Sequence, residues 1–388
     1  MIEADAAHQA STGTGATVAV IDTGATFSHP DLQGRLIAGH DYIQNDEMPQ
    51  DGNGHGTHVA GIVAANADNG VGVEGVAPGA KVLVIRALDD DGSGNTSDVA
   101  AAINEAVSKG ADVINLSLGS SSVVPGLGGD PAFDDAIGNA LDRGVIVVAA
   151  AGNDSVPACN QPSGSGRLLC VAAVDRNGDH AFYSNGSFGT SLAISAPGGA
   201  AIGAEADDVL STYKDGGYAF IAGTSQATPH VAGVAALLVS LGVHGQAAVQ
   251  RILATARDAG PAGPDAFYGA GILDARAAVA GLGNGGGGSA ARISVARVQR
   301  IGAVLRHGLI VRCTAAGTGR CRVDATRNGL HVARGSHALR TGRRVVVHAP
   351  VTRAGRLLLK AVVHSVTLRV RVTVPGAPAQ MRRVKLKR

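Results

Sequence analysis

The first 280 residues alternate between apolar runs of strand length and segments with helical periodicity. The apolar runs lie at residues 17–21, 81–86, 112–116, 145–150 and 168–174. The helical patterns lie at residues 55–66, 97–109, 132–142 and 225–241. Strands alternating with helices predict a three-layer α/β fold with a mainly parallel sheet covered on both faces. Chemistry in such sheets gathers beyond the carboxyl ends of the strands, where Asp22 and Asn153 stand.

The pattern changes after a short helical stretch that closes near residue 281. Residues 283–290 read Gly-Asn-Gly-Gly-Gly-Gly-Ser-Ala, which predicts a flexible connection with a reach of about 16 Å. Strand-length apolar or alternating segments follow at Leu309–Cys313, Arg343–His348, Leu357–Val363 and Val366–Val374. They predict a small all-β, sandwich-like domain. The expected organisation is a catalytic α/β domain at 1–281, a Gly-rich linker at 282–290 and a basic β-domain at 291–388.

Composition predicts a folded chain without a membrane span. Apolar residues make up 45% and charged residues 16%, which excludes a disordered protein. No apolar run reaches 18 residues, so we expect no transmembrane helix. The first residues, Met1–Asp5, lack the basic and apolar regions of a signal peptide. A mature form, a truncated chain and a cytosolic protein all remain compatible with this start.

The four cysteines fall into two close pairs, Cys159 with Cys170 and Cys313 with Cys321. Neither pair has the CxxC or Cys/His spacing typical of metal sites. We predict two short-loop disulfides, which imply an oxidising compartment and hence a secreted protein whose signal peptide and propeptide are not in this chain. Four buried free thiols are the alternative.

Charge is distributed very unevenly along the chain. Residues 290–388 hold 22 of the 33 Lys and Arg and only one of the 31 acids, Asp324, so this part carries +21 and the rest −19. We expect it to bind an anionic polymer, such as cell wall or nucleic acid, or to dock on its own catalytic domain; a merely solvated domain is the alternative. Arg outnumbers Lys 19 to 3, which favours bidentate contacts to phosphate or carboxylate. Phe, Tyr and Trp are absent after residue 290, so sequence-specific nucleic-acid recognition by stacking is not expected.

Three segments contain a carboxylate, an imidazole and a hydroxyl in chain order. They are Val18-Ala-Val-Ile-Asp22-Thr-Gly24, Asp51-Gly-Asn-Gly-His55-Gly-Thr-His-Val-Ala-Gly61 and Gly223-Thr-Ser225-Gln-Ala-Thr-Pro-His-Val-Ala-Gly233. A serine hydroxyl needs a neighbouring base, and the base needs an orienting group. Taken singly, Asp22 reads equally well as a helix cap and Ser225 as an N-cap. The order Asp-His-Ser is one of three chain orders in which this constellation occurs.

These segments resemble the signature blocks of the subtilisin family of serine proteases. Three further blocks agree in order: Asn115-Leu-Ser-Leu-Gly119, Ala149-Ala-Ala-Gly-Asn153 and Ser195-Ala-Pro-Gly198. The resemblance covers roughly residues 2–281. It implies a subtilisin-like fold and a serine endopeptidase that works through an acyl-enzyme without a catalytic cofactor. Asp22, His55 and Ser225 then match the catalytic triad, and Asn153 matches the side-chain donor to the oxyanion.

The resemblance also implies a peptide-binding groove. Gly92, Ser93 and Gly94 match one edge segment and Ser117, Leu118 and Gly119 match the other, so that an extended peptide pairs between them. Segment 150–152, with Gly152, matches the second wall of the primary specificity pocket. Its floor falls near residues 160–162, and the next pocket would be lined by Thr96, Val99 and Leu118. Small, uncharged walls predict broad specificity with a preference for a large apolar P1 residue.

A structural calcium site is implied at Asp31 and the loop that follows the second signature block. The matching ligands are Asp31, Asn69 and the carbonyls of Ala67, Val71 and Val73, an all-oxygen set that suits Ca²⁺. A metal-free loop is the alternative, because the N-terminal segment that gives one more ligand in the family has no counterpart here. Gln226 is a second departure, since the best-known subtilisins carry Met after the nucleophile.

Other interpretations remain to be weighed. Two further histidines of the blocks, His58 and His230, are expected to be structural because each lies on the apolar stretch of its helix. The whole protein could be a catalytically dead subtilase, or a polyanion- or cell-wall-binding protein with secondary protease activity. A nucleotide-binding protein is excluded, because no GxGxxG or GxxxxGK[ST] motif stands between a strand and a helix.

Overall fold

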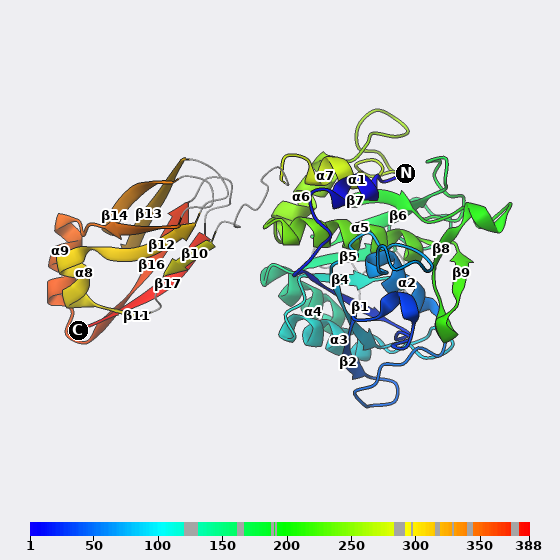
Figure 1. Cartoon of the computed structure of the whole chain (residues 1–388), viewed down its shortest axis with the longest axis horizontal. Coiled ribbons are helices and arrows are strands. Elements are labelled where there is room, and N and C mark those ends of the chain that lie inside the picture. Colours follow the sequence, from blue (N-terminus) through cyan, green and yellow to red (C-terminus); the bar gives the residue numbers. More distant parts are fainter. Residues whose placement is uncertain are drawn as a thin grey trace. The chain divides into compact units, whose positions relative to one another are not determined.

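The structure is a computed structural model that divides into two compact units, Met1–Gly283 and Asn284–Arg388 (Figure 1). Each unit is described by itself. The described residues are 1–119, 131–160, 167–187, 190, 192–282, 292–295, 298–314, 319–327, 330–339, 344–373 and 380–388. The predicted linker at 282–290 lies outside them except for Leu282. No helix among the described residues has the length and apolar character needed to cross a membrane.

A seven-stranded parallel sheet forms the centre of the first unit. Its order is β2-β3-β1-β4-β5-β6-β7, and every neighbouring pair is parallel. The strands are β1 (Thr17–Asp22), β2 (Leu36–Asp41), β3 (Lys81–Arg86), β4 (Val113–Leu116), β5 (Ile146–Ala150), β6 (Leu169–Val174) and β7 (Ala193–Pro197). All five predicted apolar runs form strands of this sheet. Strands β2 and β7 were not predicted.

Helices cover both faces of this sheet (Figure 1). They are α1 (Ala4–His8), α2 (His55–Ala64), α3 (Thr96–Ser108), α4 (Pro131–Asp142), α5 (Thr224–Ser240), α6 (Gln246–Ala254) and α7 (Ala275–Val279). Within β1, Val18 and Val20 pack in one buried cluster with α2 and α5, whereas Ala19 and Ile21 pack in another with α3 and α4. Alternate residues of one strand are thus buried on opposite faces, which explains its continuous apolar run. The predicted three-layer α/β fold is confirmed.

The topology brings the signature segments to one edge of the sheet. Strand β1 lies between β3 and β4, so the chain winds outward from it in both directions. Residues that follow β1, β4 and β5 therefore share the carboxyl edge at this switch point, where open α/β sheets hold their sites. An antiparallel hairpin of β8 (Val209–Thr212) and β9 (Tyr218–Ile221) leads into α5.

The second unit consists of two sheets and two short helices. A three-stranded sheet has the order β10-β12-β15, and a five-stranded sheet has the order β11-β17-β16-β13-β14. The disulfide Cys313–Cys321 joins β12 of one sheet to β13 of the other. The elements are β10 (Arg292–Val295), β11 (Val298–Arg300), α8 (Ile301–His307), β12 (Leu309–Thr314), β13 (Gly319–Arg327), β14 (Leu330–Leu339), β15 (Arg344–Ala349), α9 (Arg353–Ala361), β16 (Ser365–Thr373) and β17 (Gln380–Lys387).

One predicted strand of this unit is wrong. The segment Leu357–Val363 was predicted as a strand, but its first half belongs to helix α9. The side chain of Thr352 caps this helix by accepting from the Gly355 N–H at 2.9 Å. Short apolar runs do not distinguish a strand from a buried helix turn, and Leu, Lys and Ala are strong helix formers. The unit is therefore sandwich-like and β-rich, with helices that the pattern did not predict.

Candidate active site

The carboxylate of Asp22 holds the His55 ring at the end of β1. Asp22 is fully buried, and its Oδ1 accepts from His55 Nδ1 at 2.8 Å and from the Thr23 N–H at 2.7 Å. His55 opens helix α2, and Gly56 lets that helix come close to β1. A Cβ on Gly56 would lie 2.1 Å from the Gly24 carbonyl oxygen. A larger residue at position 56 would therefore push His55 away from Asp22.

A second buried carboxylate, Asp51, holds the start of helix α2. Its Oδ1 accepts from the Thr23 hydroxyl at 2.9 Å and the Gly54 N–H at 2.8 Å, and its Oδ2 accepts from the Thr57 N–H at 2.8 Å. Asp51 thus caps the helix that carries His55. It was not among the predicted site residues, although an Asp just ahead of a helical pattern is itself a capping signal.

The surroundings of His55 raise the pKa of its imidazole above the ordinary value of 6.5. Burial by itself acts in the opposite direction and lowers this pKa. The negative charge of Asp22, its hydrogen bond to Nδ1 and the charge of Asp51 together outweigh burial. The arrangement therefore stabilises a protonated His55, which is the state of a base after it has accepted a proton.

Ser225 lies in the first turn of helix α5 and is hydrogen-bonded to Ser117. The Ser225 hydroxyl donates to the Ser117 carbonyl at 3.2 Å, and the Ser117 hydroxyl donates to the Ser225 carbonyl at 2.7 Å. In the described part of the chain, no hydrogen bond joins Ser225 to His55. Hydrogen bonds of this kind are often long before substrate binds, so this orientation of the hydroxyl leaves the pairing open.

Pro229 explains why Ser225 needs Ser117. Pro229 stands four residues after Ser225 inside α5 and has no N–H with which to bond the Ser225 carbonyl. The Ser117 hydroxyl supplies the missing donor from the segment after β4, and it accepts in turn from Asn115 Nδ2 at 2.9 Å. Ser117 was predicted only as a wall of the substrate groove. Its second contact links the groove to the serine.

The side-chain amide of Asn153 is oriented by Thr224. Asn153 Oδ1 accepts from the Thr224 N–H at 3.0 Å and from the Thr224 hydroxyl at 2.9 Å. Asn153 is exposed, and its Nδ2 donates to no other described residue. A Cβ on Gly223 would lie 3.5 Å from this nitrogen and 3.7 Å from the Ser225 backbone nitrogen. The two donors therefore lie near one point beside the serine.

The predicted groove segments lie at the surface near this edge. Gly92, Ser93 and Gly94 form an exposed turn, in which Asp89 Oδ1 accepts from the Ser93 N–H at 2.9 Å. Gly119 is exposed and has open space beside its Cα.

The residues predicted for the pockets differ in burial. Ser117 is buried, Leu118 is half-buried against the cluster that contains Val99, and Gly152 is half-buried. Thr96 is exposed. Residues 161 and 162 of the predicted pocket floor lie outside the described residues.

The two additional histidines have structural contacts. His58 Nε2 lies 3.1 Å from the carbonyls of both Val209 and Ala219, which ties α2 to the β8–β9 hairpin. His230 Nδ1 donates to the Gln226 carbonyl at 2.9 Å. Burial lowers the pKa of both rings to about 4, so both are neutral at physiological pH.

The residues proposed for calcium lie together, but they satisfy one another. The buried Asp31 carboxylate accepts from Asn69 Nδ2 at 2.6 Å, from the Val73 N–H at 2.9 Å and from the Tyr218 hydroxyl at 3.4 Å. Asn69 Oδ1 accepts from the Val71 N–H at 3.1 Å. The donor set is chemically suited to Ca²⁺, but the Asn69 amide would have to turn over to present its oxygen.

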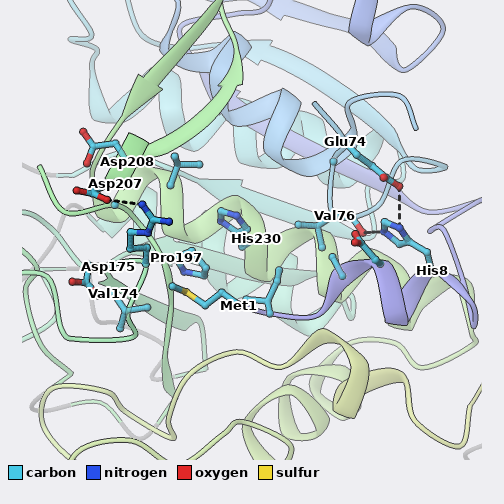
Figure 2. Close-up of a pocket in the computed structure, with 17 residues that line it drawn as sticks. Met1, His8, Glu74, Val76, Val174, Asp175, Pro197, Asp207, Asp208 and His230 are labelled. Atoms are coloured by element: carbon cyan, nitrogen blue, oxygen red, sulfur yellow. Dashed lines mark hydrogen bonds and ion pairs between the residues drawn. The ribbon is translucent and has the colours of Figure 1, made fainter. Parts of the chain in front are cut away.

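A cavity of about 330 Å³ lies elsewhere in this unit (Figure 2). Helix α1, the ends of β6 and β7, and His230 of α5 line it, whereas Asp22, His55 and Ser225 do not. It is therefore separate from the candidate active site.

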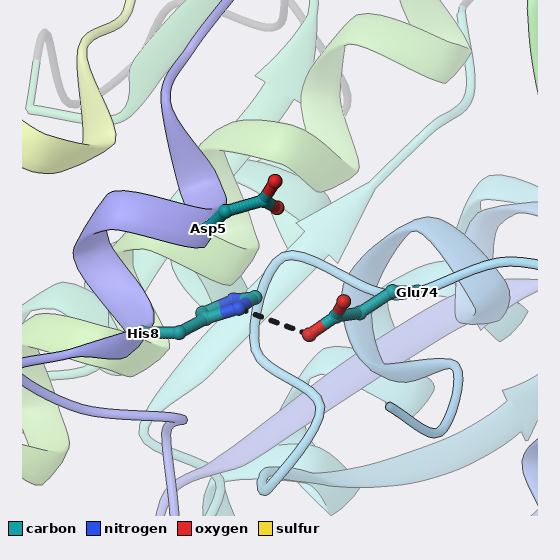
Figure 3. Close-up of side chains that lie close together, drawn as sticks. All are labelled: Asp5, His8 and Glu74. Carbon is teal, nitrogen blue, oxygen red and sulfur yellow. Dashed lines mark ion pairs between the residues drawn. The ribbon is translucent and has the colours of Figure 1, made fainter. Parts of the chain in front are cut away.

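Three titratable side chains, Asp5, His8 and Glu74, gather beside this cavity (Figure 3). His8 Nδ1 lies 3.0 Å from Glu74 Oε1, and His8 Nε2 lies 2.9 Å from the Val76 carbonyl. Both partners are acceptors, so a doubly protonated ring satisfies both contacts. We interpret the group as an anchor for helix α1.

Comparison with known proteins decides the family. The family model described as "Subtilase family" matches residues 13–271, which is more than half of the chain. The chain belongs to the subtilase family. It is a subtilisin-like serine protease, and therefore a hydrolase that acts on polypeptides. This confirms the resemblance drawn from the six sequence blocks.

Several subtilases and one solved structure are similar to this chain. Thermitase from Thermoactinomyces vulgaris is 43% identical over 241 residues, which are 62% of this chain and 81% of thermitase. Thermophilic serine proteinase from Bacillus sp. (strain AK1) is 44% identical over 229 residues, 59% of this chain and 53% of that protein. Subtilisin Savinase from Lederbergia lenta is 42% identical over 238 residues, 61% of this chain and 81% of Savinase. The solved structure is of a protease from Pseudoalteromonas arctica PAMC 21717; it has 38% identity and a TM-score of 0.65, and the match covers 72% of this chain and 94% of that chain.

Proposed function

We propose that this subtilase is a secreted endopeptidase whose triad is Asp22, His55 and Ser225. The observation that carries the proposal is the 2.8 Å hydrogen bond from His55 Nδ1 to the buried Asp22 carboxylate. This bond assigns the Nδ1 proton and leaves Nε2 as the base. The position of Ser225 in the first turn of α5, next to Asn153, supports its role as the nucleophile.

The geometry supports acyl transfer in two halves. In the first, Ser225 Oγ bonds to the substrate carbonyl carbon while His55 Nε2 takes the hydroxyl proton. His55 then gives that proton to the leaving amine as the peptide C–N bond breaks, and an acyl-enzyme remains. In the second, water repeats the attack with His55 as base, and the ester bond to Ser225 breaks.

The negative charge on the substrate oxygen would be met by two donors. One is Asn153 Nδ2, which is unused by described residues because Thr224 engages only Oδ1. The other is the Ser225 backbone N–H at the start of α5, where the helix dipole also favours negative charge. Both donors are positioned before substrate binds, so little reorganisation is needed during the reaction.

Substrate would pair as an extended strand between the segments Gly92–Gly94 and Ser117–Gly119. Backbone pairing accepts many sequences, which supports broad specificity. The open space beside Gly119 and the small residues of segment 150–152 support a large apolar P1 side chain.

Secretion is supported by the disulfides Cys159–Cys170 and Cys313–Cys321, since disulfides persist in oxidising compartments. We also propose that Asp31, Asn69 and the carbonyls of Ala67, Val71 and Val73 bind a structural Ca²⁺. The support is the all-oxygen donor set around a buried carboxylate.

A second function is proposed for residues 291–388, namely binding to an anionic polymer such as cell wall. The observation that favours it is the charge of +21 with Asp324 as the one acid after residue 290. If this were the main activity, protease activity would be secondary or lost.

Labelling with a fluorophosphonate tests the protease proposal. We expect stoichiometric labelling at Ser225 and hydrolysis of a small peptide substrate, both abolished by Ser225→Ala. A folded chain that neither reacts nor cleaves would instead be a binding protein with a subtilase fold.

A further inference from the structure

One face of the five-stranded sheet in the second unit is crowded with cations. Strand β16 alternates strictly: Leu368, Val370 and Val372 are buried, while Arg369 and Arg371 are exposed. Residues directly opposite each other in an antiparallel pair point to the same side. The strands beside β16 therefore show which other side chains share its solvent face.

Strand β17 adds a second row of positive charges to this face. Arg383 lies directly opposite Arg369, Lys385 opposite Thr367, and Lys387 opposite Ser365. All three β17 side chains are exposed, and Val384 and Leu386 between them are buried. We call Arg369, Arg371, Arg383, Lys385 and Lys387 the cationic face.

The acid of this unit lies on the other half of the same sheet. Asp324 of β13 faces Arg371 on one side and Arg334 on the other. Its Oδ1 already accepts from His331 Nδ1 at 2.7 Å and from Arg334 Nε at 3.2 Å. Asp324 is the one acid after residue 290, so this unit has no other carboxylate side chain for the cationic face.

The cationic face therefore contains repulsion that the unit does not relieve. Like charges directly opposite on neighbouring strands destabilise a sheet, and Arg369 and Arg383 are such a pair. Among the described residues, none of the five side chains of the face takes part in an ion pair. The buried Val and Leu side chains beneath hold the strands together. A bound anion would relieve the repulsion that remains.

We propose that the cationic face binds a linear phosphodiester polymer. This inference rests on the proposed polymer binding by residues 291–388 and assigns it to one surface. Successive exposed side chains on a strand are about 6.6–6.8 Å apart, and neighbouring strands are about 4.8 Å apart. The face is thus two parallel rows of charge, which suit a chain with recurring anionic groups better than a single small ion.

The chemistry of the face selects phosphate and is indifferent to bases. Guanidinium groups donate in a fork, and a phosphodiester has two anionic oxygens that can each accept from a different arginine. Arg369 and Arg383 are placed to contact one phosphate from both strands. Aromatic residues are absent after residue 290, so nucleobases cannot stack on this unit. Recognition is therefore of the backbone charge.

The test uses the full chain with Ser225→Ala, which prevents self-digestion, and long-chain inorganic polyphosphate as the probe. The face variant combines Arg369→Gln, Arg383→Gln and Lys385→Gln. The matched control removes three exposed cations from helices α8 and α9 with Arg306→Gln, Arg353→Gln and Lys360→Gln. We expect the face variant to bind at least tenfold more weakly at 0.1 M salt and to have a smaller salt slope, while the control stays within threefold of the parent.

Further measurements separate this inference from the proposals on which it rests. Ser365→Lys adds a charge to the same face and should tighten binding, which tests the surface even if the triple variant unfolds. Polyphosphate and single-stranded DNA of equal charge should bind alike, and polyglutamate more weakly. Equal weakening of the face and control variants, or tighter binding to polyglutamate, would overturn the assignment. Absence of binding by the parent would overturn polymer binding altogether, and cleavage of a small peptide by the chain with Ser225 intact would still support the protease proposal.

Discussion

Ser117 and Ser225 exchange two hydrogen bonds across the candidate active site, although they are 108 residues apart in the chain. The Ser117 hydroxyl occupies the place of a helix N–H that Pro229 lacks. The carbonyl of the proposed nucleophile is therefore satisfied by a residue of the proposed substrate groove. A change in the groove at Ser117 would be felt at Ser225.

Ser117→Ala should lower the free energy of unfolding by about 1–3 kcal/mol, because it leaves the Ser225 carbonyl without a donor. The penalty should be smaller when Pro229 is also replaced by Ala, since residue 229 then has an N–H for that carbonyl. A double-mutant cycle by denaturant unfolding measures this coupling. Ser108→Ala, which removes an exposed hydroxyl bonded to the Glu105 carbonyl, is the control and should show no coupling to position 229. Equal penalties for Ser117→Ala in both backgrounds would contradict the account.

The acid limb of kcat/KM should have its midpoint above pH 6.5, because the pKa of His55 is raised and only the neutral ring acts as base. Asp22→Asn removes the charge that raises this pKa, so the midpoint should move to lower pH. Activity should also fall by about 10⁴-fold, as in the corresponding change in another triad protease. Rates on a small peptide between pH 5 and 9 provide the measurement. Asp179→Asn, at an exposed acid, should leave the midpoint in place; an unmoved midpoint in Asp22→Asn would remove Asp22 from this role.

Asn153→Leu should lower kcat by about 10²–10³-fold with little change in KM, the loss known for an oxyanion-hole amide in a subtilisin. The amide donates to charge that develops only during the reaction, so substrate binding is spared. Thr224→Val removes one of the two bonds that orient the amide and should cause a smaller loss of kcat. Steady-state kinetics on one peptide substrate compare the three proteins. A change in KM alone would mean that Asn153 contacts substrate rather than the oxyanion.

Chelation of calcium should lower the melting temperature of the Ser225→Ala chain, since an ion bound only to the folded state stabilises it. Asp31→Asn removes the buried charge of the proposed site and should abolish the effect of EDTA. Asp68→Asn, at an exposed acid of the same loop, should retain it. Thermal unfolding with and without EDTA decides the matter, and identical curves for the parent chain would count against calcium.

The elements that the sequence predicted well are those buried on both faces. Strands β1, β3, β4, β5 and β6 lie inside a parallel sheet and read as continuous apolar runs. The edge strand β2 has exposed positions, including Ile37 at 41%, and its mixed pattern gave no signal. Helix α9 was mistaken for a strand, because a run of three leucines has no period that separates the two structures.

Sequence by itself determined the family and the residues of its chemistry, because Asp22, His55, Ser225 and Asn153 stand in short local blocks whose order and spacing can be read along the chain. Only the tertiary structure decided which side chains support them and where the charge of the second unit gathers. Asp51 reaches Thr23, and Ser117 reaches Ser225, through contacts that no local spacing specifies. Strand register decides that Arg369 faces Arg383, because a shift of one residue would turn one of the two side chains into the core.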